Sequence, residues 1–198
     1  SNVENMSYAF STRSEADDGN LIEILGLGKF DTSNVKYMRQ TFAFDDKLEN
    51  VDVRNWDTKN VQDMSSMFNA CYALSELDLS DWNTRNVQDM SEMFGWCKSI
   101  KKIYVGDNWN TDKVTSSTDM FDYCPNLVGQ SGIIYDSTKT DVSMANYQSG
   151  YLTYKVPSQK LSSNDVAKAI LEDTIPLSSL SLTSSDTSDT EKTKETNE

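Results

Sequence analysis

The sequence contains no histidine, and this absence removes much of the chemistry on which enzymes commonly rely. Histidine is the usual general base near neutral pH, the partner of catalytic serine and cysteine, and a frequent zinc ligand. Cysteine is also scarce, because the chain has only 3 and no CxxC pair that could form half of a zinc site. We therefore expect a protein that is not an enzyme, has no catalytic residues and uses no cofactor.

Positive charge is scarce as well, and this limits the partners of the chain. Lysine and arginine number 18 against 31 aspartates and glutamates, so the formal net charge is −13. Proteins bind nucleic acids by neutralising phosphates with basic residues, so we expect no nucleic-acid partner. An anionic membrane surface is disfavoured for the same reason.

Long apolar runs are missing too. No stretch approaches the roughly 20 apolar residues that a helix needs to cross a bilayer, so membrane insertion is not expected. The first residues, SNVENMSYAF, are not a basic segment followed by an apolar one, so they do not indicate a signal peptide. Because the chain starts within a repeat, we interpret it as a fragment or a mature segment that does not itself carry the targeting and anchor signals.

What the sequence does contain is a repeat. Three similar segments begin at Asn34, Asn60 and Asn86, each 26 residues after the last, and incomplete copies precede and follow them. A fixed period between 20 and 50 residues is typical of solenoids, in which each unit buries its apolar side against its neighbours. The positions shared by the copies are Val35, Val61 and Val87; Met38, Met64 and Met90; Phe42, Phe68 and Phe94; and Trp56 and Trp82.

Each copy predicts a helix followed by a short strand. From Val61 to Leu74 the apolar residues fall at intervals of three and four, which indicates one face of an amphipathic helix. Asn60 stands where a helix N-cap is expected. After the helix, apolar and polar residues alternate, which indicates a strand with one buried face. The paired apolar residues of these strands are Leu25 and Leu27, Val51 and Val53, Leu77 and Leu79, and Ile103 and Val105. Copies related by translation must place these strands in a parallel ladder.

The stretch LDLSDWNTRNVQDMSEMF, which recurs with few changes, resembles the BspA-like leucine-rich repeats of bacterial surface proteins. The resemblance covers about residues 1–129. It implies an α/β leucine-rich-repeat solenoid with a parallel β-ladder on one face, short helices on the other, and a C-terminal cap. Members of this family are typically secreted or wall-displayed adhesins and interaction proteins. The resemblance therefore implies an extracellular or cell-surface location and a protein or host-surface ligand, with no particular partner.

The composition changes along the chain and predicts three regions. Residues 1–129 form the solenoid, and residues 130–156, rich in aromatic and branched side chains, form a C-terminal capping segment. Residues 157–198 are rich in serine, threonine and charge, which is typical of a flexible linker or stalk. Within that tail, residues 163–173 can form one short amphipathic helix.

Cysteine and tryptophan recur at particular positions of the repeat. Cys71, Cys97 and Cys124 occupy one position, beside the repeated phenylalanines, so we interpret them as a buried column, with a disulfide between adjacent copies as the alternative. The recurring tryptophans are expected in the core. Trp96 stands outside their register and is therefore predicted to be an exposed aromatic.

The outward side of the predicted ladder is the candidate binding surface, because its residues differ between copies while the buried ones recur. Packing holds the buried positions to one residue type, whereas outward positions are free to specify a partner. The predicted ligand-binding residues are Asn50, Asp52, Arg54, Glu76, Asp78, Ser80, Lys102 and Tyr104. A calcium-type cation between Asp52 and Asp78 remains an alternative to a solvated acidic face.

The predicted function is thus a non-catalytic, adhesin-type interaction module that binds a partner through the strand face. Two alternatives remain open at this point. One is a structural spacer or stalk that binds nothing itself, and the other is an accessory module of a larger surface enzyme. The oligomeric state does not follow from the sequence.

Overall fold

A computed structural model of the chain describes residues 2–12 and 22–158. The predicted short helix at 163–173 and nearly all of the predicted linker lie outside the described residues. The described elements are a 3-10 helix η1 (Leu27–Lys29), strands β1 (Glu76–Leu79) and β2 (Lys102–Val105), a second 3-10 helix η2 (Val142–Met144) and strand β3 (Thr153–Tyr154).

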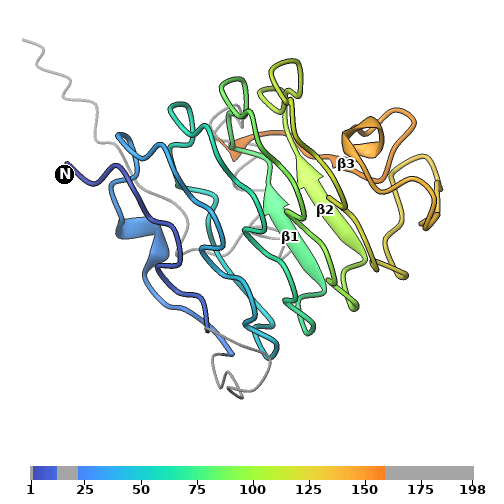
Figure 1. Ribbon diagram of the computed structural model, residues 1–198, viewed down its shortest axis with the longest axis horizontal. Helices are drawn as coiled ribbons and strands as arrows, with labels where there is room; N and C mark the ends of the chain where they lie inside the picture. The colour runs from blue at the N-terminus through green and yellow to red at the C-terminus, as the bar shows by residue number, and fades with distance from the viewer. Residues whose placement is uncertain (1, 13–21, 159–198) are drawn as a thin grey trace, which may run out of the picture. The chain divides into compact units, whose positions relative to one another are not determined.

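The three strands form one small parallel sheet in the order β1-β2-β3. Strands β1 and β2 come from equivalent positions of consecutive copies and lie side by side (Figure 1). Leu77 pairs with Ile103 and Leu79 with Val105, and all four side chains are buried. Alternation of apolar and polar residues therefore identified these two strands and their inward face correctly.

The segments predicted as helices are chains of tight turns. We call residues 37–45, 63–71, 89–97 and 116–124 the turn segments. From residue 2 to 12 and from 22 to 157, the only helices are η1 and η2. Each turn segment holds two residues with positive φ, four positions apart, which an α-helix does not accommodate. These residues are Gln40 and Phe44, Ser66 and Ala70, Glu92 and Trp96, and Asp119 and Tyr123.

Backbone hydrogen bonds between copies explain why turns replace helices. In the second turn segment every other N–H donates to the next copy, at N···O distances of 2.8–3.0 Å. These bonds run from Met64, Ser66, Phe68 and Ala70 to the carbonyls of Asp89, Ser91, Met93 and Gly95. A helix would use these N–H groups within itself. Successive four-residue turns space their apolar side chains at three and four residues, as a helix does, so the periodicity could not separate the two.

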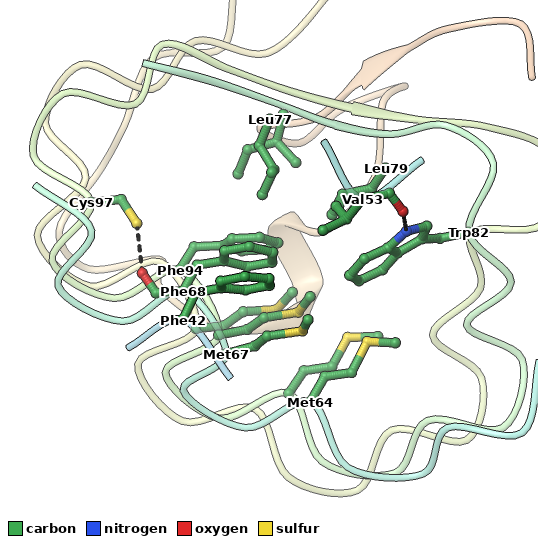
Figure 2. Packing of buried hydrophobic residues seen from close by; sticks show 14 of the residues in the cluster. Phe42, Val53, Met64, Met67, Phe68, Leu77, Leu79, Trp82, Phe94 and Cys97 are labelled. Atoms are coloured by element: carbon green, nitrogen blue, oxygen red, sulfur yellow. Dashed lines mark hydrogen bonds between the residues drawn. The ribbon is translucent and has the colours of Figure 1, made fainter. Parts of the chain in front are cut away.

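The buried side chains of successive copies stack on one another. The rings of Phe42, Phe68 and Phe94 stack in sequence with centroid separations of 5.4 and 6.1 Å (Figure 2). Phe121 follows Phe94 at 5.5 Å. Trp82 donates its indole N–H to the carbonyl of Val53 at 2.9 Å, so a buried polar group is satisfied by the preceding copy. The repeat thus builds one continuous apolar core.

The cysteines form the predicted buried column. All 3 are free and buried, so no disulfide joins adjacent copies. Each thiol donates to the carbonyl of a phenylalanine in the preceding copy at 3.1 Å, as Figure 2 shows for Cys97 and Phe68. Burial raises the pKa of all three thiols well above the ordinary value, which keeps them protonated and unreactive.

The first predicted strand does not form. Leu25 is 82% exposed, whereas Leu27 is buried within η1. Gly26 lies between them with φ of 83°, a left-handed conformation that breaks the alternation of an extended strand. Residues 51–53 do not form a strand either, although Val53 is buried.

The segment after the last copy packs against the end of the core. Tyr151 is buried and meets the ring of Phe121 edge-on, with centroids 5.4 Å apart. The indole N–H of Trp109 donates to the carbonyl of Ala145 at 3.0 Å. Strand β3 then adds to the free edge of β2, which brings residues 153–158 next to the strand-bearing side of the repeats (Figure 1).

Candidate interaction surfaces

All but one of the residues predicted to bind a ligand lie on the outward side of β1, of β2 and of the equivalent segment in the preceding copy. We call this surface the strand face. Its exposed members are Asn50, Asp52, Glu76 and Lys102, and its half-buried members are Arg54, Asp78 and Tyr104.

Ser80 was predicted to belong to the strand face and does not. It is only 3% exposed. The chain turns inward after β1, because the Ser80 N–H bonds back to the Asp78 carboxylate at 3.0 Å. The Ser80 carbonyl then packs so closely on Gly106 that an added Cβ there would lie 2.1 Å from it. Alternation beyond the end of a strand therefore predicted the wrong side.

Asp52 and Arg54 form a two-point ion pair within one copy. Arg54 Nε lies 2.9 Å from Asp52 Oδ1, and a second guanidinium nitrogen lies 3.0 Å from Oδ2. This hydrogen bonding lowers the pKa of Asp52 below its ordinary value. The sequence spacing of two residues is compatible with the contact, since both side chains project from the same side of an extended segment.

Lys155 joins the strand face, and sequence reasoning missed it. Its Nζ lies 2.7 Å from Asp78 Oδ2, and 5.2 Å from the centroid of the Tyr104 ring. The Tyr104 hydroxyl donates to Glu76 at 3.3 Å, and burial raises the pKa of Tyr104. Lys155 and Asp78 are 77 positions apart, so no local pattern could have paired them. The contact exists because β3 extends the sheet.

These ion pairs bear on the hypothesis of a cation between Asp52 and Asp78. Each carboxylate already has a basic partner, Arg54 or Lys155, that a cation would have to displace. Across the described residues, no group of three or more histidine, cysteine, aspartate or glutamate side chains is placed to hold a metal ion. The strand face therefore presents mixed charge around one tyrosine rather than an acidic row.

A second exposed surface lies beside the cysteine column. Trp96 is 42% exposed, as predicted, and its ring stacks on that of Tyr123 with centroids 4.6 Å apart and an interplanar angle of 25°. Lys98 Nζ lies 4.0 Å from the centroid of Tyr72, 5.7 Å from that of Trp96 and 5.9 Å from that of Tyr123. We call these four residues the aromatic–lysine cluster. Only Trp96 was singled out from the sequence, because the others come together through the stacking of copies.

Comparison with known proteins places the chain in a family. Residues 4–132 match the model of the family described as Mycoplasma protein of unknown function, DUF285. Because this match spans more than half of the chain, the protein belongs to that family. No curated protein and no solved structure matched the chain. Within the described residues, no helix is both long and apolar enough to cross a membrane.

Proposed function

We propose that this chain is a non-catalytic interaction module of the BspA-like leucine-rich-repeat type, which acts at a cell surface or after secretion. In this proposal the copies stack as a solenoid, and a protein partner or host-surface ligand binds the strand face. Equivalent residues of four successive copies support the stacking, because Tyr37, Asp63, Asp89 and Ser116 form consecutive parallel bridges.

The observation that carries the proposal is the contrast between inward and outward positions of the strand-bearing segments. Inward, the copies hold branched residues that pack in one core. Outward, equivalent positions hold Asn50, Glu76 and Lys102 in one row, and Asp52, Asp78 and Tyr104 in the next. Because these outward residues are not held to one type by packing, they are available to specify a partner.

The chemistry of the strand face suits a protein ligand. Tyr104 is a half-buried aromatic side chain between carboxylates and lysines, and such residues are frequent hot spots of protein interfaces. Lys102 adds an exposed charge in the neighbouring row. Since both signs of charge occur, the expected partner surface is polar and of mixed charge rather than uniformly basic.

The test is binding of the immobilised chain to a panel of purified extracellular proteins, measured by biolayer interferometry. A double variant, Lys102→Ala with Tyr104→Ala, should lower the affinity for the partner by about tenfold or more, as expected for a hot spot. The matched control is Lys113→Ala with Tyr37→Ala, because both residues are exposed and lie outside the strand face. Both variants should keep the circular-dichroism melt of the parent.

The proposal is contradicted if a partner binds the parent and the strand-face variant with equal affinity. In that case the site lies elsewhere on the module. If no member of the panel binds and the chain merely separates a tagged domain from the cell surface, a spacer or stalk is the better description.

A further inference from the structure

We propose that the aromatic–lysine cluster is a second binding site, which takes a sugar ring that carries a carboxylate. The cluster gathers the rings of Tyr72, Trp96 and Tyr123 around the ammonium group of Lys98. These residues come from three successive copies and belong to neither of the rows that form the strand face. The inference therefore stands apart from the proposed function.

The backbone at the cluster makes its large rings hard to explain by folding alone. Trp96 has φ of 63° and Tyr123 has φ of 53°, a left-handed conformation that is uncommon for bulky residues and suits glycine or asparagine better. The same position is left-handed in the other turn segments, where it holds Phe44 and Ala70. The left-handed conformation is therefore a property of the turn segment itself, and it does not require a large side chain at this position.

Burial does not account for that choice. Trp96 and Tyr123 remain 42% and 50% exposed, so much of their apolar surface stays in contact with water. Their mutual stacking returns only part of the free energy that full burial would give. A ligand that covers the exposed ring surface would gain the remainder. Two large exposed aromatic side chains side by side are typical of recognition sites rather than of structural surfaces.

Lys98 supplies the charge that selects the ligand. Within the part of the chain that the structure describes, it forms no ion pair, although the protein carries 31 acidic residues. Its Nζ instead lies among three aromatic rings, which attract a cation and leave ammonium N–H groups for an acceptor. A carboxylate is the acceptor that such a site binds most strongly, through a charge-assisted hydrogen bond.

The net charge limits the ligand to a small anion. At −13, the protein repels polyanions such as nucleic acids, and one lysine can neutralise only one carboxylate. A carboxylated pyranose meets both demands of the cluster. Its C–H face can pack on the Trp96 and Tyr123 rings while its carboxylate reaches Lys98. The same sugar could be a free acid or the last residue of a glycan.

The fluorescence of Trp96 reports on binding. The other tryptophans are less accessible to a ligand, because Trp56 and Trp82 are buried and Trp109 is half-buried. The whole chain is titrated with N-acetylneuraminic acid and with glucuronic acid, and separately with glucose and N-acetylglucosamine. The acids should change the tryptophan emission in a saturable manner and protect it from iodide quenching. The neutral sugars should bind at least about tenfold more weakly, the usual effect of losing one charged hydrogen bond.

Variants then assign the site by saturation-transfer NMR, which does not depend on Trp96 fluorescence. Trp96→Ala and Lys98→Met should each lower the affinity for the acids about tenfold or more, while Lys98→Arg should retain most of it. The control is Tyr8→Ala, because Tyr8 is also left-handed, with φ of 62°, and 54% exposed. Lys102→Ala with Tyr104→Ala should leave sugar binding unchanged, which separates this site from the strand face.

The same measurements with a free sugar acid and with an oligosaccharide ending in it distinguish the two sources of the ligand. Tighter binding of the oligosaccharide points to a glycan terminus. Equal binding of acidic and neutral sugars, no binding of either, or an unaffected Lys98→Met variant would overturn the proposal. Binding of a glutamate-rich peptide without binding of the sugar acids would also overturn it, and would make the cluster a protein contact.

Discussion

The turn segments and the strand segments of the repeat differ in how uniform they are. All four turn segments place a left-handed residue at the same two positions, and the first three send alternate N–H groups to the next copy. The strand segments are less regular. Only two copies form β1 and β2, and the first predicted strand is interrupted at Gly26.

The difference indicates which positions of the repeat are held to one residue type by packing and which positions can vary. The turn segments carry the stacked phenylalanines, the methionines and the cysteine column, so a change there disturbs two neighbouring copies at once. The outward residues of the strand segments contact solvent and can change with little cost to packing. Uniform positions thus belong to the structural side of the repeat, whereas the varying positions lie on the strand face, for which we propose partner binding.

The largest expected effect comes from emptying the turn-side core. Phe68→Ala should lower the free energy of unfolding by about 3–5 kcal/mol, because the ring is fully buried between Phe42 and Phe94. Phe10→Ala should cost less, since Phe10 is only partly buried and lies at the end of the stack. Urea unfolding measures both. Equal losses would mean that the central copies are no better packed than the first.

Asp45, which lies in the first turn segment, should make the stability of the fold depend on pH. It is buried at the position that cysteine holds in later copies, and neither of its carboxylate oxygens has a hydrogen-bond partner among the described residues. Burial raises the pKa of Asp45 to about 7. In the unfolded chain the pKa of this carboxyl group is about 3.9. Between about pH 4 and 7 the folded state therefore binds more protons, and the stability contributed by this group falls as the pH rises.

The variant Asp45→Asn removes that titration. It should match the parent near pH 4 and be the more stable of the two at pH 8, by up to about 4 kcal/mol. Urea unfolding at both pH values checks the difference between the two proteins, which cancels the titration of carboxylates elsewhere in the chain. Parallel stability–pH curves for parent and variant would show that Asp45 stays ionised in the fold.

The smallest expected effect tests the turn backbone directly. Gln40 has φ of 51°, so Gln40→Gly should be neutral or stabilise the protein by up to about 1 kcal/mol. Gln62 is exposed and is not left-handed, so Gln62→Gly should destabilise by about 0.5–1 kcal/mol. Thermal and urea melts compare the pair. If both substitutions destabilise alike, the segments behave as helices and not as stacked turns.

Sequence reasoning was most reliable where one position recurs in every copy. It placed Phe42, Phe68 and Phe94 in the core, and it identified the cysteine column and the exposure of Trp96. It was wrong about the helices, about the strands at 25–27 and 51–53, and about Ser80. The helix error arose because the local spacing of apolar residues does not record which backbone groups a neighbouring copy will satisfy.

The amino-acid sequence by itself determined the 26-residue period and most of the side chains that face inward, because burial of apolar surface follows directly from residue type and spacing. Only the tertiary structure decided the conformation of the turn segments, since their alternate N–H groups find acceptors in the next copy and not in their own. The tertiary structure also decided which surface side chains contact one another. Lys155 meets Asp78, and Lys98 meets three rings, through stacking and sheet extension that join residues far apart in the chain.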